Sequence, residues 1–154
     1  MAAVNGESFS NQSLSHKSRW TDTFSVHQSF PTVLVIDDDP EVAELVGCFL
    51  TREEFRPVLA LSGKAGVRLA RSLLPSLILC DVSMPDTDGL KVIEALGCDP
   101  ATAHIPIVLM SGHDAASLDG SGASAFLQKP FHMSEMVHVV RRLLNPCPAL
   151  EYAT

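Results

Sequence analysis

Five polar side chains in this sequence have types and positions that suit phosphate chemistry around a metal ion. Asp37 and Asp38 directly follow the apolar run VLVI, and Asp81 directly follows the run LILC. Two further apolar runs end at Ser111 and close to Lys129. Neighbouring carboxylates repel one another, so a group of them is tolerated when some are protonated or when a cation lies among them. If these runs converge in the fold, the sequence predicts a cation site.

The donor atoms of this set predict which ion and which reaction the site would serve. Carboxylate oxygens suit a hard divalent cation such as Mg²⁺, which prefers near-octahedral oxygen coordination. Such an ion can orient and neutralise a phosphoryl group, while Lys129 and Ser111 meet other phosphoryl oxygens. Asp81 would then be free to act as a carboxylate nucleophile.

The residues between these positions predict the elements that bring them together. Short apolar stretches alternate with stretches of helical periodicity from Pro31 onward. Strands are expected at residues 33–36, 58–61, 77–80, 107–110 and 125–128, and helices at residues 40–50, 65–74, 90–96 and 133–144. This alternation predicts an α/β fold with a doubly wound, five-stranded parallel sheet in the order 2-1-3-4-5. The candidate residues would then share the carboxyl edge of the sheet, where such folds bind ligands.

Three other acids are expected to serve local structure. Asp39 precedes Pro40 at the start of a helical pattern and is interpreted as the helix N-cap. Asp86 and Asp88 lie in the loop after Asp81 and are interpreted as loop and cap residues.

Two segments depart from a regular pattern. Residues 112–124 are too few and too rich in glycine for a full fourth helix, so a helix of about two turns or fewer, or an irregular loop, is expected. Glu54 lies in a turn where a left-handed conformation would be strained.

The composition limits the function classes. The chain has 154 residues, of which 46% are hydrophobic and 19% charged, with a net charge of −7. This balance argues against a nucleic-acid-binding surface. The four cysteines lie far apart, and Cys48 and Cys80 fall in apolar runs, which predicts free buried thiols in a reducing, cytoplasmic compartment. No apolar stretch is long enough to span a membrane. We expect a disordered polar extension over residues 1–30, in which Trp20 and Phe24 could form an interaction arm, a folded domain over 31–145, and a tail over 146–154.

From Pro31 to about Leu144 the chain resembles the receiver domains of two-component response regulators, a CheY-like family. The resemblance rests on VLVIDDDP, LILCDVSMPDTDGL, IPIVLMSG and FLQKPF, in that order. It implies that Asp81 is the phosphoacceptor. It also implies that Asp38 is a direct Mg²⁺ ligand, that Asp37 contacts the metal mainly through water, and that Ser83 contributes its backbone carbonyl.

The same resemblance implies roles near the carboxyl end of the chain. Ser111 corresponds to the switch hydroxyl, Lys129 to the lysine of the K-P pair, and Phe126 to the switch aromatic residue. A cis peptide bond is implied between Lys129 and Pro130. Two features depart from the family: the short segment before Phe126 puts a standard dimer interface in doubt, and Phe in place of Tyr removes a hydroxyl.

Three functions remain open at this stage. The first is a phosphorelay module that takes a phosphoryl group from a histidine kinase or a histidine phosphotransfer protein and controls an unknown downstream protein. It would be a stand-alone regulator or a piece of a hybrid kinase or larger regulator, and the extension beginning at Met1 favours the former. The second is a protein-interaction scaffold that is not phosphorylated. The third is a metal-dependent phosphatase, for which no general base is evident.

Overall fold

A computed structural model describes residues 29–113 and 115–146 of the chain. Almost all of the expected polar extension, including Trp20 and Phe24, and most of the expected tail lie outside these residues. The division into extension, domain and tail therefore stays a prediction. None of the described helices is long and apolar enough to cross a membrane.

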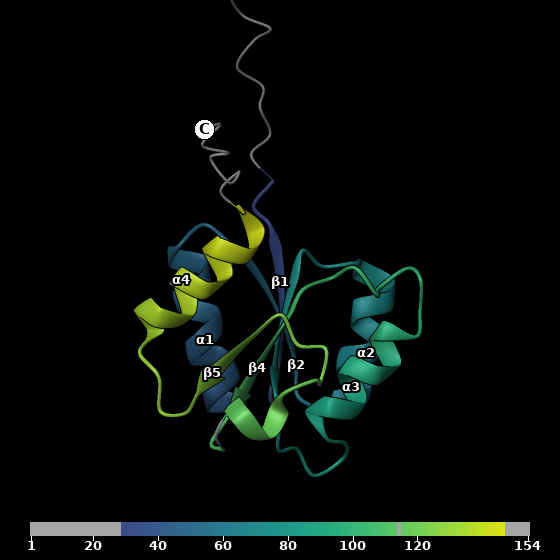
Figure 1. Ribbon diagram of the computed structural model, residues 1–154. Coiled ribbons are helices and arrows are strands. Elements are labelled where there is room, and N and C mark those ends of the chain that lie inside the picture. The colour runs from purple at the N-terminus through teal and green to yellow at the C-terminus, as the bar shows by residue number, and fades with distance from the viewer. Residues whose placement is uncertain (1–28, 114, 147–154) are drawn as a thin grey trace, which may run out of the picture.

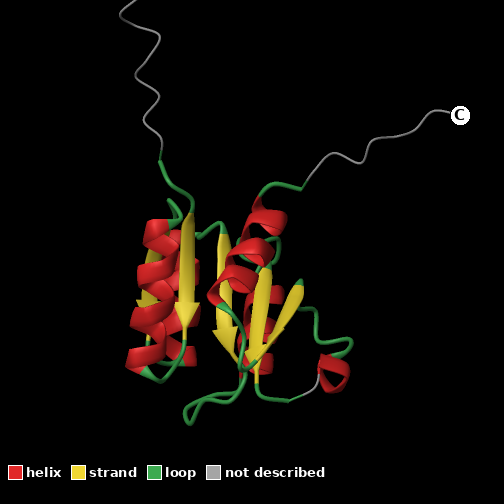
Figure 2. Cartoon of the chain, turned by 90° about the vertical axis from the view of Figure 1, so that its left-hand side faces the viewer, coloured by secondary structure: helices red, strands yellow, loops and turns green. Residues whose placement is uncertain are grey.

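The described residues form a five-stranded parallel sheet with helices on both faces (Figure 1). The strands are β1 (Thr32–Ile36), β2 (Arg56–Ala60), β3 (Leu77–Asp81), β4 (Ile107–Ser111) and β5 (Ala125–Gln128). The helices are α1 (Pro40–Arg52), α2 (Gly63–Leu73), α3 (Gly89–Gly97) and α4 (Met133–Leu144). The sheet order β2-β1-β3-β4-β5 confirms the predicted topology. All five strands point the same way, so their carboxyl ends lie together at one edge of the sheet (Figure 2).

Alternation along the strands builds two hydrophobic cores, one on each side of the sheet. Val33 and Val35 of β1 face α1 and α4, whereas Leu34 and Ile36 face α2 and α3. The same division holds in β3 and β4. Because both faces are covered, β3 and β4 are buried along their whole length, as expected for central parallel strands.

The first helix begins where the sequence predicts. Asp39 is the N-cap of α1, with its carboxylate accepting the N–H of Glu41 at 3.0 Å, and Pro40 follows as the first helical residue. This cap satisfies a backbone donor that the helix itself cannot satisfy. Glu54 has a φ of 65°, so the turn after α1 places a non-glycine residue in the left-handed region, where the sequence indicated that a side chain is strained.

Two sequence-based expectations were wrong in detail. Strand β2 begins and ends earlier than residues 58–61, and Leu61 lies beyond it and is exposed. Cys48 was expected to be buried but is exposed, whereas Cys80 is buried. The reason for the second error is the position of Cys48 on the outer side of α1, since Ala43, Val46, Gly47 and Leu50 form the buried side. A run of apolar letters does not by itself show which side of a helix faces the core.

The segment between β4 and β5 contains one short 3₁₀ helix, η1 (Ala115–Leu118). Among the described residues of this segment there is no longer helix, which confirms the expectation of a helix of about two turns or fewer. Gly120 and Gly122 follow with positive φ values of 78° and 86°, a conformation that glycine adopts without strain. Leu118 is buried and packs into the core on the α2 and α3 side of the sheet.

The packing of α2 on β1 leads to a stability prediction for Gly66. A Cβ atom at Gly66 would lie 2.4 Å from Cδ1 and 2.7 Å from Cγ1 of Ile36, which is fully buried. We expect Gly66→Ala to lower the free energy of unfolding by about 1–3 kcal/mol, because overpacking outweighs the better helix propensity of alanine. Urea unfolding followed by circular dichroism measures this change.

Gly97 is the matched control for this prediction. It lies at the end of α3, and a Cβ atom there meets nothing within 4 Å. Gly97→Ala should therefore raise stability, by up to about 1 kcal/mol. Equal effects of the two substitutions would show that α2 is not packed tightly on Ile36.

Candidate functional site

Three carboxylates meet at the carboxyl edge of the sheet. Asp37 follows β1 directly, Asp38 is the next residue, and Asp81 is the last residue of β3. Strands β1 and β3 are neighbours, with Ile36 paired to Cys80, so the residues after them come close together. One carboxylate oxygen from each acid lies within 4.8 Å of the others. We call these three residues the acidic cluster.

The members of the acidic cluster differ in their exposure to solvent. Asp37 and Asp81 are buried, at 1% and 7% exposure, whereas Asp38 is exposed. Both oxygens of Asp37 have partners, because Oδ1 accepts the N–H of Asp39 at 3.0 Å and Oδ2 contacts Lys129. Asp37 is therefore held in one orientation, and Asp38 is the acid most open to an ion arriving from solvent.

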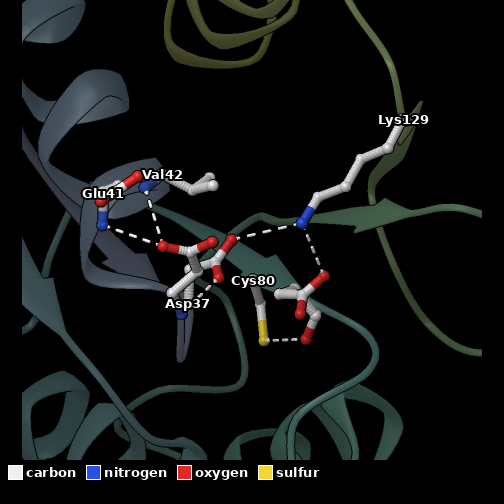
Figure 3. A network of polar contacts seen from close by, with 7 residues as sticks. Asp37, Glu41, Val42, Cys80 and Lys129 are labelled. Atoms are coloured by element: carbon white, nitrogen blue, oxygen red, sulfur yellow. Dashed lines mark hydrogen bonds and ion pairs between the residues drawn. The ribbon is translucent and has the colours of Figure 1, made fainter.

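Lys129 supplies the positive charge that faces the acidic cluster (Figure 3). Its Nζ donates to Oδ1 of Asp81 at 3.0 Å and to Oδ2 of Asp37 at 3.3 Å. The residue directly follows β5, and the peptide bond to Pro130 is cis, the geometry that the family resemblance implies. The backbone N–H of Lys129 also donates to the Ser111 carbonyl at 2.7 Å, which fixes the position where its side chain starts.

The surroundings shift the protonation equilibria of this group of residues. Burial raises the pKa of Asp81, Lys129 opposes that rise, and Asp37 and Asp38 add to it, so the pKa lies above its usual value. Burial acts to lower the pKa of Lys129, but the hydrogen bond to Asp81 and the charges of the buried acids outweigh it and raise the pKa. Lys129 therefore stays charged. Burial and then the charge of Asp81 raise the pKa of the Cys80 thiol, which stays neutral.

The other predicted site residues lie on the strands and loops beside the acidic cluster. Ser111 ends β4 and is buried, and its Oγ accepts the N–H of His113 at 3.0 Å. Phe126 lies in β5, paired with Leu109, and packs as a half-buried side chain on the α2 and α3 side of the sheet. Ser83 is exposed in the loop that follows Asp81. The acidic cluster, Ser111 and Lys129 thus lie at or directly after the carboxyl ends of their strands, whereas Phe126 lies within β5. Lys129 is linked to Asp37 and Asp81 through its side chain and to Ser111 through its backbone.

The donor set fits a divalent cation. The acidic cluster offers oxygen ligands alone. Its three carboxylates are accompanied by one ammonium group, which contacts Asp37 and Asp81, so an excess of negative charge remains. Oxygen ligands with one carboxylate open to solvent suit an ion that keeps several of its waters.

Two contacts around the site were not predicted from the sequence. Lys129 pairs with Asp37 as well as with Asp81, and Asp86 accepts backbone N–H groups from α2. Both contacts join residues that are far apart in the chain, so no local pattern could have shown them. The prediction that Asp88 is a helix cap is confirmed, because it is the N-cap of α3.

Comparison with known proteins identifies the family. Residues 33–141 match the model of the response regulator receiver domain. The chain therefore belongs to the receiver-domain family of response regulators. Members of this family are signalling modules of two-component systems rather than classical enzymes.

Two similar response regulators are longer than this chain. The DNA-binding dual master transcriptional regulator RpaA of Synechocystis is 38% identical over 119 residues, which is 75% of this chain and 49% of that protein. The response regulator PleD of Caulobacter vibrioides is 40% identical over 102 residues, which is 64% of this chain and 22% of that protein. The chain thus spans half or less of the length of these relatives.

Solved structures support the same fold. The receiver domain of the Francisella response regulator 1452 is similar with a TM-score of 0.70 and 26% identity, over 75% of this chain and 98% of that one. The chemotaxis protein CheY4 of Vibrio cholerae superposes with a TM-score of 0.71 over 75% of this chain and 100% of that one. At 22% identity, the second comparison shows the fold alone.

The raised pKa of Asp81 leads to a prediction about stability. Because the folded protein holds the Asp81 proton more tightly than the unfolded chain does, ionising this carboxyl costs stability. That cost grows as pH rises from the unfolded carboxyl pKa through the raised folded one, and it is complete at neutral pH. We expect Asp81→Asn to raise the melting temperature at neutral pH without divalent ions, and to raise it less in acid, as measured by calorimetry across pH.

Asp39→Asn is the control for this measurement. It removes a neighbouring negative charge, but asparagine can still cap α1. Its effect on the melting temperature at neutral pH should be small. A melting temperature that falls in Asp81→Asn at neutral pH would contradict the idea that the ionised carboxylate is unfavourable in the folded state.

Proposed function

We propose that this chain is the phosphoacceptor of a two-component phosphorelay and that it is phosphorylated on Asp81. The observation that carries the proposal is the pairing of a buried Asp81 with Lys129 at 3.0 Å inside a cluster of three acids. The phosphoryl donor is a phosphohistidine on a histidine kinase or a histidine phosphotransfer protein. Membership of the receiver family supports this donor class, because such domains act in two-component systems.

The chain's own residues perform the transfer by positioning. An Asp81 carboxylate oxygen attacks phosphorus, a P–O bond forms as the P–N bond to the donor imidazole breaks, and the imidazole leaves with the electron pair. Lys129 already holds Oδ1 of Asp81, which orients the carboxylate. An ammonium group has three N–H donors, and two are used by Asp81 and Asp37, so the third can meet a phosphoryl oxygen.

Asp38, Asp81 and the backbone carbonyl of Ser83 would hold a Mg²⁺ ion, with Asp37 contacting it mainly through water. When bound, the ion neutralises negative charge on the phosphoryl group and on the acids around it. Asp37 orients Lys129 through Oδ2, and its own orientation is fixed by the N–H of Asp39. The chain catalyses only its own phosphorylation and dephosphorylation in this proposal.

Ser111 and Phe126 would report phosphorylation to a partner. The Ser111 hydroxyl is buried at the end of β4, and it can donate to a phosphoryl oxygen after a small shift. Phe126 is three residues before Lys129, so a movement of the β5 end would carry both residues. As a phenylalanine it can turn inward without forming a hydrogen bond there. A downstream protein would distinguish the two conformations.

The partners and the setting follow from this chemistry. We propose that the chain controls a protein directly, without contacting nucleic acid or membrane, although RpaA carries DNA binding in its name. We place the exchange in the cytoplasm, where free thiols such as Cys48, Cys80 and Cys98 stay reduced. The domain would comprise residues 31–145.

A scaffold without phosphorylation is not favoured. A scaffold would have no use for a buried acid paired with a lysine, since such a group costs free energy to keep ionised.

A phosphorylation assay tests the proposal. The full 154-residue chain is incubated with a small phosphodonor and Mg²⁺, and its intact mass is measured by mass spectrometry. We expect one phosphoryl adduct that is stable in acid and labile in base. The adduct should be absent in Asp81→Asn and should disappear when a chelator removes the divalent cation.

Asp39→Asn is again the matched control, because it changes an acid of the same run that caps α1 instead of joining the acidic cluster. It should be phosphorylated as fast as the unchanged protein. An unmodified Asp81 under these conditions would favour the scaffold, and continuous release of phosphate would favour a phosphatase.

A further inference from the structure

The loop after Asp81 is attached to a distant helix by one carboxylate. Asp86 lies in this loop, and its Oδ1 and Oδ2 accept the backbone N–H groups of Gly63 and Lys64, each at 3.2 Å. These N–H groups belong to the first turn of α2. The carboxylate therefore joins the loop between β3 and α3 to the start of α2.

Close packing accompanies these two hydrogen bonds. A Cβ atom at Gly63 would lie 1.9 Å from Cγ2 of Thr87, the residue after Asp86. Only glycine lets the loop approach α2 this closely. The contact is thus built by two features, a residue without a side chain on the helix and a two-oxygen acceptor on the loop.

The rest of the loop shows why this attachment matters. At its ends, the N–H of Gly89 donates to the Val82 carbonyl at 2.9 Å, and Asp88 caps α3. Between these ends lie residues 83–87, where Asp86 makes its two hydrogen bonds to α2 and Met84 packs against the core on the α2 and α3 side of the sheet. Ser83 is in this stretch and is exposed.

Capping of α2 alone does not account for the arrangement. Ser62 is already the N-cap of α2 and accepts the N–H of Ala65 at 3.1 Å. Lys64 is exposed, so water can satisfy its N–H without help from a loop 22 residues away. The two bonds add polar contacts to a loop that is otherwise held at its ends and by the packing of Met84 and Thr87, so they help to order it.

We infer that Asp86 is a positioning residue that holds the loop carrying Ser83 in place beside Asp81 and so sets how tightly the acidic cluster binds a divalent cation. This inference rests on the proposed function for the site, but it concerns cation binding and can be tested without phosphorylation. Asp86 is exposed, and the slight loss of solvent around it acts to raise its pKa, but the hydrogen bonds from the backbone N–H groups of Lys64 and Gly63 outweigh this effect and lower the pKa. Both oxygens of the ionised carboxylate thus remain acceptors at neutral pH.

A magnesium titration of matched variants tests the inference. Asp86→Asn keeps one acceptor oxygen but places an amide NH₂ against the second backbone N–H. Asp88→Asn makes the same chemical change two residues away in the same loop, where only the N–H of Leu90 needs an acceptor. Nuclear magnetic resonance follows backbone amides around Asp81 as MgCl₂ is added. We expect Asp86→Asn to raise the Mg²⁺ dissociation constant about tenfold, as is typical when a residue that orients metal ligands is replaced. Asp88→Asn should leave the dissociation constant nearly unchanged.

Two further measurements separate positioning from folding. Thermal unfolding should show that both variants remain folded at the titration temperature. Asp86→Glu, which keeps two acceptor oxygens, should recover part of the lost affinity. The inference is overturned by equal Mg²⁺ affinity in Asp86→Asn and the unchanged protein, by equal losses in Asp86→Asn and Asp88→Asn, or by an unchanged protein that binds no Mg²⁺. If the unchanged protein binds Mg²⁺ but accepts no phosphoryl group, the proposed function fails while this inference stands.

Discussion

The contact of one ammonium group with two of three neighbouring carboxylates is the interaction on which the site depends. Lys129 reaches Asp37 and Asp81, and neither acid is exposed enough for water to replace that contact fully. The local charge is still negative, which is visible in the raised pKa of Asp81, to which burial contributes most and the neighbouring acids contribute further. The fold therefore holds a group of charges whose balance a cation would improve.

The sheet order makes this arrangement possible. Strands β1 and β3 are adjacent, so the acids that follow them meet, although they lie far apart in the chain. Lys129 directly follows β5, which is an edge strand of the sheet, and it is 92 residues from Asp37 in the sequence. The two cores on either side of the sheet keep these strand ends in register, because β1, β3, β4 and β5 place alternate residues in opposite cores. Packing that contacts no site residue thus determines the distances between the charges.

Much of this could be predicted from the sequence, because the deciding signals were local. Apolar runs ending in Asp81 and Ser111 marked the strand ends, and Asp39 before Pro40 marked the start of α1. Contacts between distant elements could not be predicted. Examples are the hydrogen bonds of Asp86 with the first turn of α2 and the close packing of Gly66 against Ile36. The exposed position of Cys48 was missed for the same reason, since helical periodicity alone left the orientation of α1 open.

The contacts of Lys129 also bear on how a modified Asp81 could affect distant residues. A phosphoryl group would add negative charge to a site that already has an excess of negative charge. The Lys129 ammonium group would therefore be attracted toward the phosphoryl group. The backbone of Lys129 is bonded to the end of β4, and its strand carries Phe126, so such a shift would act on β4 and β5 together. Among the described residues between these strands, the helical element is the short helix η1, which is one turn long and packs on the core through Leu118. The short connection thus favours β4, β5 and η1 as the elements that respond to the charge at Asp81.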